Sequence, residues 1–427
     1  MRTPVFCSPW SLMACLLAAA SAQSLAQDQP KVPAPPAEQA AVPATQPARA
    51  AESARTPTFR RMERPNHGRQ FVAPELLKKA DHSIERGFAF LKRNQGQQGG
   101  WMEPHGPAIT ALVAKAFAQS PEFGPKHEIV QAAAEFVLRF QQQDGGIYNP
   151  ANGLANYETC TAIMFLVDLR AHDPKADAAV KKAVEFLRKI QWDEGEGISQ
   201  DNPMWGGVRY DPDKKRPDLS NTQYFMEALS QAGVPADDPA MQRALLFVQR
   251  CQDLSQTNDQ PWARGAVPKD HVEGGFIYNP MPEDNKTEYP EGSGIERPRT
   301  YGSMTYAGFK SMLYAGVTRE DPRVRGALEW IGAHYTLDAN PNMPEAQNEQ
   351  GLYYYYQVFG AAFQALDAKL IPTRTRGQVN WREDLISAVT ARQLEDGSWI
   401  NRKDRWMEGE ANYITAVSIL ALQSALN

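Results

Sequence analysis

The sequence predicts an all-α fold in which six helical hairpins close into a double ring, an α/α toroid. Three observations support this prediction: a helical motif recurs six times, a glycine turn follows each copy, and the helix after each turn is more apolar than the helix before it. Such recurrence is typical of repeat architectures, in which each unit buries its apolar face against its neighbours.

Residues 1–26 predict a signal peptide. Arg2 supplies a positive charge near the N-terminus, and the apolar run that follows at 12–20 is too short to span a bilayer. Two small-residue patterns, at 20–22 and 24–26, are typical of cleavage sites. We therefore expect an exported protein, periplasmic or secreted after cleavage.

Residues 27–70 predict a flexible linker, because a segment rich in proline and alanine buries too little apolar surface to offset its ordering entropy. The toroid is expected over 71–427. This part keeps only Cys160 and Cys251, so either one disulfide bridge or two buried free thiols is expected. The net charge of -5 gives no sign of the concentrated basic face of a nucleic-acid binder, so no nucleic-acid partner is expected.

The recurring motif is a small residue, two spacers, an aromatic and an aliphatic residue, three spacers and a glutamine. These spacings keep the residues on one helical face, so each copy predicts an amphipathic outer helix. The fifth copy has Tyr335 where glutamine is expected, and the sixth is degenerate at its front. The copies are Gly87-Phe90-Leu91-Gln95, Ala133-Phe136-Val137-Gln141, Ala183-Phe186-Leu187-Gln191, Ala244-Phe247-Val248-Gln252, Ala327-Trp330-Ile331-Tyr335 and Leu385-Ala388-Val389-Gln393.

A glycine turn with a bulky third residue follows each copy, because glycine permits the backbone angles of a sharp reversal. The turns begin at Gly99, Gly145, Gly206, Gly274, Gly351 and Gly397. A second, more apolar helix then follows, and in five of six hairpins it carries a threonine at the same register: Thr110, Thr159, Thr222, Thr305 and Thr415. Phe359 takes that place in the fifth hairpin. These helices are expected to form the inner ring.

A closed ring is favoured over an open solenoid, because the last apolar helix lacks the polar face of a capping repeat. The links from each outer helix to its inner partner are expected on one rim, and the longest lie at 253–300 and 336–350. Loop elaboration on one face of a repeat ring is typical of a working face. Unpaired N–H groups at the inner-helix starts are also expected there, giving a positive dipole suited to polar or anionic groups.

The glutamine–aromatic–glycine pattern resembles the repeats of squalene and oxidosqualene cyclases over about residues 75–427. The same ring is used by protein prenyltransferase beta subunits and by complement-type thioester domains. The resemblance implies the fold and, as an expectation, an apolar isoprenoid ligand inside the ring. Because one fold hosts unrelated functions, it does not imply a particular activity.

The chain departs from the catalytic motifs of these families. Squalene cyclases use Asp-x-Asp-Asp-Thr-Ala with a central aspartic acid, and the matching stretch here has Ser220 at the acid position and Asn221 next to it. Neither side chain is a strong Brønsted acid. Prenyltransferases hold zinc partly through a Tyr-His-Thr histidine, whose place is taken by Gln357, and the thioester motif has no match. We therefore expect neither a metal site nor a cofactor.

The candidate functional residues lie mainly near the inner-helix starts. Asp218 and Glu410 are the candidates for a catalytic role. Aromatic rings there would stabilise carbocations in a terpenoid cavity or stack on sugar rings, and core packing or helix capping is the alternative for each residue. The candidate ligand-binding residues are Trp101, Glu158, Trp205, Tyr210, Asn221, Thr222, Gln223, Tyr301, Tyr306, Tyr356, Gln357, Glu408 and Tyr413.

Three functions are compatible with these features. The first, which we favour, is a squalene cyclase-like protein that binds or transforms an apolar isoprenoid but lacks the cyclase acid. The second is a carbohydrate-active enzyme, and the third is a non-catalytic binding or scaffold module with an envelope protein or other partner. An apolar cavity lining would favour the first. An open cleft with paired carboxylates and stacking rings would favour the second. A ring centre filled by side chains would favour the third.

Overall fold

The computed structural model describes residues 66–427, except 212–215, 266, 268 and 282–296. The predicted signal peptide at 1–26 and the linker up to residue 65 lie outside the described residues. Within those described ranges, no helix combines the length and the apolar character needed to cross a membrane.

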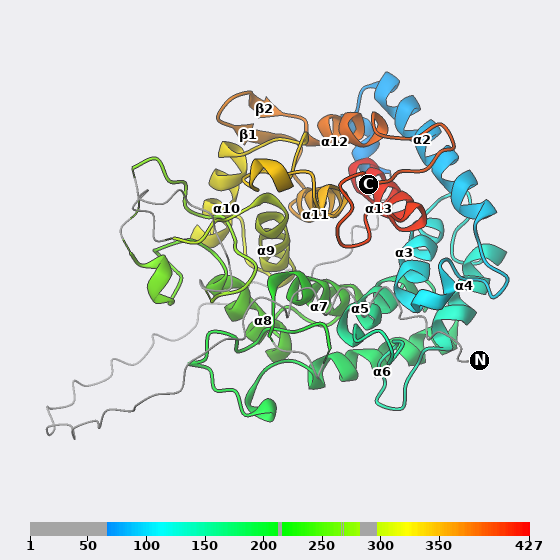
Figure 1. Cartoon of the computed structure of the whole chain (residues 1–427), viewed down its shortest axis with the longest axis horizontal. Coiled ribbons are helices and arrows are strands. Elements are labelled where there is room, and N and C mark those ends of the chain that lie inside the picture. The colour runs from blue at the N-terminus through cyan, green and yellow to red at the C-terminus, as the bar shows by residue number, and fades with distance from the viewer. Residues whose placement is uncertain (1–65, 212–215, 266, 268, 282–296) are drawn as a thin grey trace, which may run out of the picture. The chain divides into compact units, whose positions relative to one another are not determined.

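Twelve α-helices form the described part of the fold and alternate between an outer and an inner position (Figure 1). The outer helices are α2 (Pro74–Arg93), α4 (Glu128–Leu138), α6 (Pro174–Lys189), α8 (Pro239–Arg250), α10 (Pro322–Ala333) and α12 (Trp381–Thr390). The inner helices are α3 (Pro107–Ala118), α5 (Ala155–Leu166), α7 (Leu219–Ala232), α9 (Gly302–Tyr314), α11 (Leu352–Ala365) and α13 (Ala411–Leu426).

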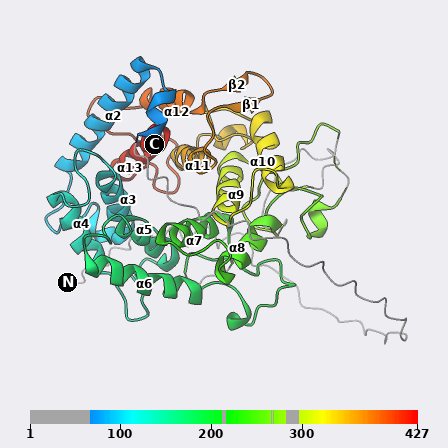
Figure 2. The same ribbon diagram turned by 180° about the vertical axis from the view of Figure 1, so that it is seen from behind.

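The inner helices close into a ring. Each inner helix packs against the next in chain order, and α13 packs against α3 (Figures 1 and 2). Two side-chain hydrogen bonds join the ends of the chain: Gln423 Nε2 donates to Ala116 O at 2.9 Å, and Gln393 Nε2 donates to Ser83 O at 2.8 Å. The predicted α/α toroid is therefore confirmed.

Local sequence starts three of the outer helices in the same way. An Asp-Pro pair places aspartate at the N-cap and proline at the first helical position, where its missing N–H costs nothing. Asp173, Asp238 and Asp321 each accept from the backbone N–H two residues later, at 2.8 to 2.9 Å. The helix α13 lacks such a cap but is buried along most of its length, as expected for an inner helix.

The repeated glutamine fastens each hairpin to the next. In each of the five copies that have it, its side-chain amide donates both to its own glycine turn and to a backbone carbonyl of the neighbouring outer helix. Gln191 Nε2, for example, donates to Gly206 O at 2.8 Å and to Ala240 O at 2.9 Å. In the fifth copy Tyr335 takes over this role, because its hydroxyl donates to Asp384 Oδ2 on α12 at 3.0 Å.

In five of the six turns, the glycine that begins the turn lies directly on the next outer helix. Gly206 has a φ of +84°, and a Cβ there would lie 2.0 Å from Arg243 O of α8. Gly99, Gly145, Gly274 and Gly397 repeat this contact on α4, α6, α10 and α2. Glycine is therefore required both for the left-handed backbone and for the close approach.

The repeated threonine fastens each turn to its own inner helix. Thr222 Oγ1 accepts from Val208 N, just after the glycine pair, at 3.0 Å and donates to Asp218 O at 2.8 Å. Thr110, Thr159, Thr305 and Thr415 accept the equivalent N–H in their own hairpins. This structural contact is enough to explain why the threonines recur at the same register, and no ligand-binding role is needed to account for them.

Two small elements accompany the ring. A 3-10 helix, η1 (His67–Phe71), packs against the end of α13, and Gly68 N donates to Asn427 O at 3.1 Å. Residues 66–70, assigned to the linker from composition, therefore belong to the folded unit. Strands β1 (Ile371–Thr373) and β2 (Gly377–Val379) form a hairpin, which is the sole sheet in the described part of the chain besides isolated bridges.

Candidate functional site

In each hairpin a link joins the outer helix to the inner helix. This link covers the N-terminus of the inner helix that belongs to the hairpin before it. Asn156 N of α5 donates to Tyr210 O, and Leu219 N of α7 donates to Tyr278 O, at 3.0 and 2.7 Å. Ser303 N of α9 donates to Asn340 Oδ1 at 2.9 Å. At each of these helices the following hairpin therefore already uses one of the backbone donors that the helix itself leaves unpaired.

Seven tyrosines meet at the centre of the ring, near the starts of the inner helices. We call them the tyrosine cluster: Tyr157, Tyr210, Tyr224, Tyr278, Tyr301, Tyr354 and Tyr413. The rings of Tyr157 and Tyr224 meet edge to face with centroids 5.0 Å apart, and those of Tyr224 and Tyr354 are 6.3 Å apart. Tyr157 also hydrogen-bonds Tyr413. The Tyr224–Tyr354 contact joins α7 to α11, which α9 separates, and the Tyr157–Tyr413 contact joins α5 to α13, which α3 separates. These two contacts therefore cross the ring.

The cluster is accessible but not charged. Six of its members are half-buried, and Tyr224 is buried at 4% exposure. Burial raises the pKa of each phenol, that of Tyr157 to about 12. The hydroxyls are therefore neutral groups that can both donate and accept hydrogen bonds.

Buried amides near the cluster have polar atoms without partners. Gln223 of α7 is fully buried, and neither its Oε1 nor its Nε2 finds a partner among the described residues. Gln357 Oε1 of α11 and Asn412 Oδ1 of α13 are in the same situation in this part of the chain. Buried amide atoms are costly to leave unpaired, so these positions suit water or a polar ligand better than a hydrocarbon.

A network of charged and polar side chains fills the ring further along the inner helices. Glu227 of α7 accepts from Lys310 Nζ of α9 at 2.6 Å and from Gln231 Nε2 at 3.0 Å. Lys115 Nζ of α3 donates to Gln231 Oε1 at 2.9 Å and pairs with Asp168 at 3.8 Å. The ring centre is thus polar at this level and is not an open apolar cavity.

Asp218, a catalytic candidate, is the N-cap of α7. Its carboxyl is buried and accepts from Asn221 N at 2.8 Å and from Asn221 Nδ2 at 2.9 Å. Burial raises its pKa to about 6, while hydrogen bonds from Asn221 and Tyr278 oppose that rise. A carboxyl of this strength is a poor proton donor to an alkene, and its geometry is that of a helix cap. Ser220, at the cyclase acid position, lies 3.3 Å from Tyr354 Oη.

Of the other three rim carboxyls, Glu158 and Glu408 are buried and Glu410 is exposed. Glu158 is buried and accepts from Asn149 N and Asn152 Nδ2, both at 2.6 Å. Glu408 is buried and holds the start of α11 by accepting from Tyr353 N at 3.0 Å and Tyr354 N at 2.9 Å. Burial raises the pKa of both carboxyls to about 7. The other catalytic candidate, Glu410, is exposed and makes no side-chain cap on α13.

Several aromatic candidates lie in the walls of the ring. Trp101 is fully buried and donates to Leu91 O at 2.7 Å, and Trp205 donates to Glu194 Oε1 at 3.1 Å. Tyr306 packs among Tyr355, Phe359 and Phe363. Tyr356 donates to Leu337 O at 2.6 Å. Of the candidates, the structure therefore brings Tyr210, Tyr301 and Tyr413 into the cluster. Asp218, Asn221, Gln223 and Gln357 lie beside it.

The candidate list lacked four members of the cluster: Tyr157, Tyr224, Tyr278 and Tyr354. The helical register could have identified one of them. Tyr157 and Tyr413 both stand two residues before the repeated threonine, as does Ser220. Equivalent positions on equivalent inner helices face the same centre, so the selection of Tyr413 implied Tyr157 as well.

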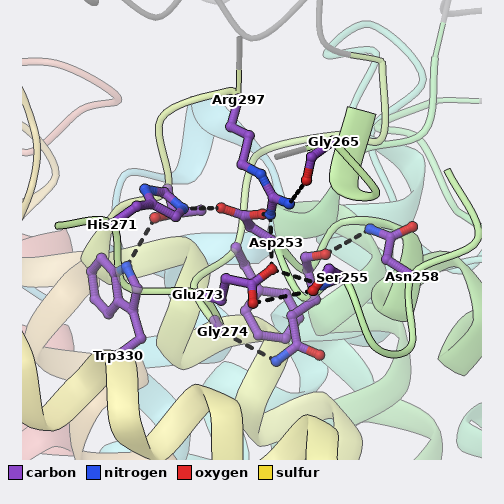
Figure 3. Close-up of polar contacts among 12 residues, drawn as sticks. Asp253, Ser255, Asn258, Gly265, His271, Glu273, Gly274, Arg297 and Trp330 are labelled. Carbon is purple, nitrogen blue, oxygen red and sulfur yellow. Dashed lines mark hydrogen bonds and ion pairs between the residues drawn. The ribbon is translucent and has the colours of Figure 1, made fainter. Parts of the chain in front are cut away.

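A buried ionic cluster holds the base of the long fourth link (Figure 3). Asp253 is fully buried, accepts from Arg297, and lies 2.5 Å from His271 Nε2. Arg297 also binds Glu273 at 2.9 Å, and the Ser255 hydroxyl donates to Glu273 at 3.2 Å rather than to His271. This arrangement braces the two ends of the link and does not form a nucleophile–base pair. No sequence motif identifies this cluster, because its members are spread over 45 positions.

The described surface has two hollows. One of about 630 Å³ lies between α10 and the β1 strand, beside Arg325 and Arg374. The other, of about 350 Å³, is bounded by the start of α11 and by Asn401, Arg402 and Lys403. No group of three His, Cys, Asp or Glu side chains among the described residues is placed to hold a metal ion. Cys160 and Cys251 are both buried and free.

Comparisons with known proteins agree with the ring fold. A D-mannose isomerase matches with a TM-score of 0.50 at 13% identity, covering 80% of this chain and 96% of that one. A polysaccharide lyase gives 0.50 at 9% identity, with coverage of 82% and 97%. A type II terpene cyclase from Scytonema gives 0.34 at 12% identity, with coverage of 83% and 99%. At such identities the likenesses to the isomerase and the lyase show the fold alone.

No family model and no curated protein matches the chain. The class that the fold and the site define is an α/α toroid whose centre is filled by tyrosines.

Proposed function

We propose that this protein is a binding module that holds a polyhydroxylated ligand, a glycan, on the tyrosine cluster. The observation that carries the proposal is the set of half-buried, neutral phenols at the ring centre. A sugar ring presents an apolar C–H face to an aromatic ring and hydroxyls to its polar tip, and tyrosine offers both kinds of contact with little conformational entropy to lose.

The unpaired amides near the cluster support a polar ligand. Gln223, Gln357 and Asn412 each have an amide oxygen without a described partner. Sugar hydroxyls donate and accept, so they can satisfy such atoms directly or through water. Binding of this kind gains specificity because a ligand that lacks the hydroxyl leaves the buried amide unpaired.

An isoprenoid ligand is less well supported. A long hydrocarbon chain needs enclosed apolar volume, but tyrosine pairs and the Glu227–Lys310 ion pair occupy the ring centre. Pressing hydrocarbon against unpaired amides would cost roughly 2–7 kcal/mol for each group. The terpenoid hypothesis therefore becomes the alternative outcome of the binding test.

Catalysis also lacks support from the described residues. Asp218, Glu158 and Glu408 are buried and engaged by hydrogen bonds that position helices and links. Hydrolysis of a glycosidic bond requires two carboxyls that face a common substrate, one of them free to exchange a proton. Binding without turnover is consequently the function that the geometry supports best.

Replacing Tyr354 should weaken ligand binding. Tyr354→Ala removes a ring and a hydroxyl from the centre of the cluster, and we expect affinity to fall about tenfold or more, as for a buried aromatic contact. Isothermal titration calorimetry would use mannose, xylose and N-acetylglucosamine oligomers, with farnesol as the isoprenoid probe. The matched control is Tyr335→Phe, a change on the outer ring. Binding of farnesol but of no sugar would overturn the proposal.

We also propose that the chain is exported, as its first 26 residues predict. An exported glycan-binding module would meet its ligand outside the cytoplasm. N-terminal sequencing of the native protein should find a start near Gln23 or Gln27. An intact Met1 would refute export.

A further inference from the structure

Trp406 is unusual among the large aromatic residues because it is 42% exposed, whereas Trp101, Trp330 and Trp399 are at most 1% exposed. It lies on the link between α12 and α13. A single exposed apolar side chain is ordinary on a protein surface, so the way this indole is held and what lies beside it decide whether it has a role.

The link holds Trp406 firmly. Asn401 N donates to Glu408 O at 2.7 Å, and Gly409 N donates to Asp404 Oδ1 at 2.8 Å. The guanidinium of Arg405 lies 4.4 Å from the indole centroid and donates to Gln350 Oε1 at 3.1 Å. Trp406 is therefore presented by hydrogen bonds and a cation–π contact, not left on a loose loop.

The backbone is strained to reach this position. Trp406 and Met407 have φ values of 56° and 65°, in the left-handed region that side chains other than glycine disfavour. Such residues cost of order 1–3 kcal/mol each and are concentrated at ligand clamps and active sites. Two in succession, at an exposed tryptophan, are consistent with a recognition role.

Trp406 is next to the tyrosine cluster. Its Cζ3 atom lies 3.1 Å from where a Cβ on Gly351 would be, and Gly351 is the N-cap of α11, three residues before Tyr354. Arg405 is close enough to Tyr301 to act electrostatically on its hydroxyl. The exposed indole and the half-buried phenols thus lie on the same rim.

We propose that Trp406 is a second stacking position for the glycan on the tyrosine cluster, so that the ligand is a chain of several sugars and not a single one. This inference rests on the proposed function. One sugar would sit on the cluster and a later unit of the same chain would stack on the indole, beside the Arg405 guanidinium. Because both contacts belong to one ligand, the second contact forms within a complex that is already bound, and the overall affinity for the glycan rises.

The test compares ligand lengths. Disaccharides and hexasaccharides of mannose, xylose and N-acetylglucosamine would be titrated into the full mature chain and into Trp406→Ala, Trp406→Tyr and Leu370→Ala. Leu370 is another exposed apolar residue, at 49%, beside the β1 strand on the outside of the ring. Trp406→Ala should weaken hexasaccharide binding about tenfold and leave disaccharide binding unchanged. Trp406→Tyr should retain most of the hexasaccharide affinity, and Leu370→Ala all of it.

The outcomes separate this inference from the proposed function. If Tyr354→Ala abolishes sugar binding and Trp406→Ala weakens neither length, the second stacking position is refuted and the glycan site stands. If Trp406→Ala weakens both lengths equally, Trp406 belongs to the first position and the inference again fails. If the wild type binds no sugar, the proposed function falls, and the inference falls with it.

Discussion

Gly206→Ala is expected to lower the free energy of unfolding by about 4 kcal/mol or more. Gly206 has a φ of +84°, which a residue with a Cβ adopts only at a cost. The new methyl group would also lie 2.0 Å from Arg243 O, a contact that can be relieved only by moving the turn away from α8. Urea denaturation followed by circular dichroism would measure the loss.

Gly197→Ala is the matched control, because it separates the two causes. Gly197 has a similar φ of +73°, but a Cβ there would meet nothing within 4 Å. We expect this variant to lose only about 1 kcal/mol, the cost of the backbone angle. Equal losses in the two variants would contradict the packing of the third turn against α8.

The hairpins could be predicted from sequence because their signals are local. The small–aromatic–aliphatic spacing sets one helical face, and a glycine turn marks where each outer helix reverses. The same signals did not reveal what the repeated glutamine does. Gln191 joins its own turn to Ala240 of the next hairpin, a contact that exists only once both hairpins have folded.

The candidate site was harder to predict, because its contacts join segments that lie far apart in sequence. Tyr157 meets Tyr413 across the ring, and no periodic pattern in either helix identifies the partner. The partners of the rim donors are hidden from the sequence for a related reason. Leu219 N is unpaired within its own hairpin, and its acceptor, Tyr278 O, comes from the next one.

Glu408→Ala is expected to lower the free energy of unfolding by about 3 kcal/mol. The carboxylate is 1% exposed and accepts from Tyr353 N, Tyr354 N and Asn401 Nδ2, the last at 2.6 Å. Alanine would leave these buried donors unpaired and the start of α11 without its cap. Thermal and urea denaturation would both report the loss.

Glu410→Ala supplies the control, since Glu410 stands two residues away, is exposed and makes no side-chain cap on α13. Its removal should change stability by no more than about 0.5 kcal/mol, as expected for a surface position. From the sequence, Glu408 is a candidate for ligand binding and Glu410 for catalysis. A comparable loss in both variants would show that Glu408 does not hold α11.

Glu408 should also make stability depend on pH. Burial raises its pKa to about 7 from an ordinary 4.5, although hydrogen bonds from Asn401 and the start of α11 oppose the rise. The folded protein therefore holds this proton more tightly than the unfolded chain, so the stabilisation is complete below pH 4.5 and is lost as the pH rises towards 7. For one group the slope is at most about 1.4 kcal/mol per pH unit.

Glu408→Gln isolates this contribution, because Glu158 and Asp218 also have raised pKa values and titrate in both proteins. Glutamine stays neutral, so the variant should gain stability relative to the wild type as the pH rises from 4.5 to 7. Urea denaturation at half-unit pH steps would give the two curves. Parallel curves across this window would mean that the hydrogen bonds to Glu408 cancel the effect of its burial, so that its pKa is the same in the folded and the unfolded protein.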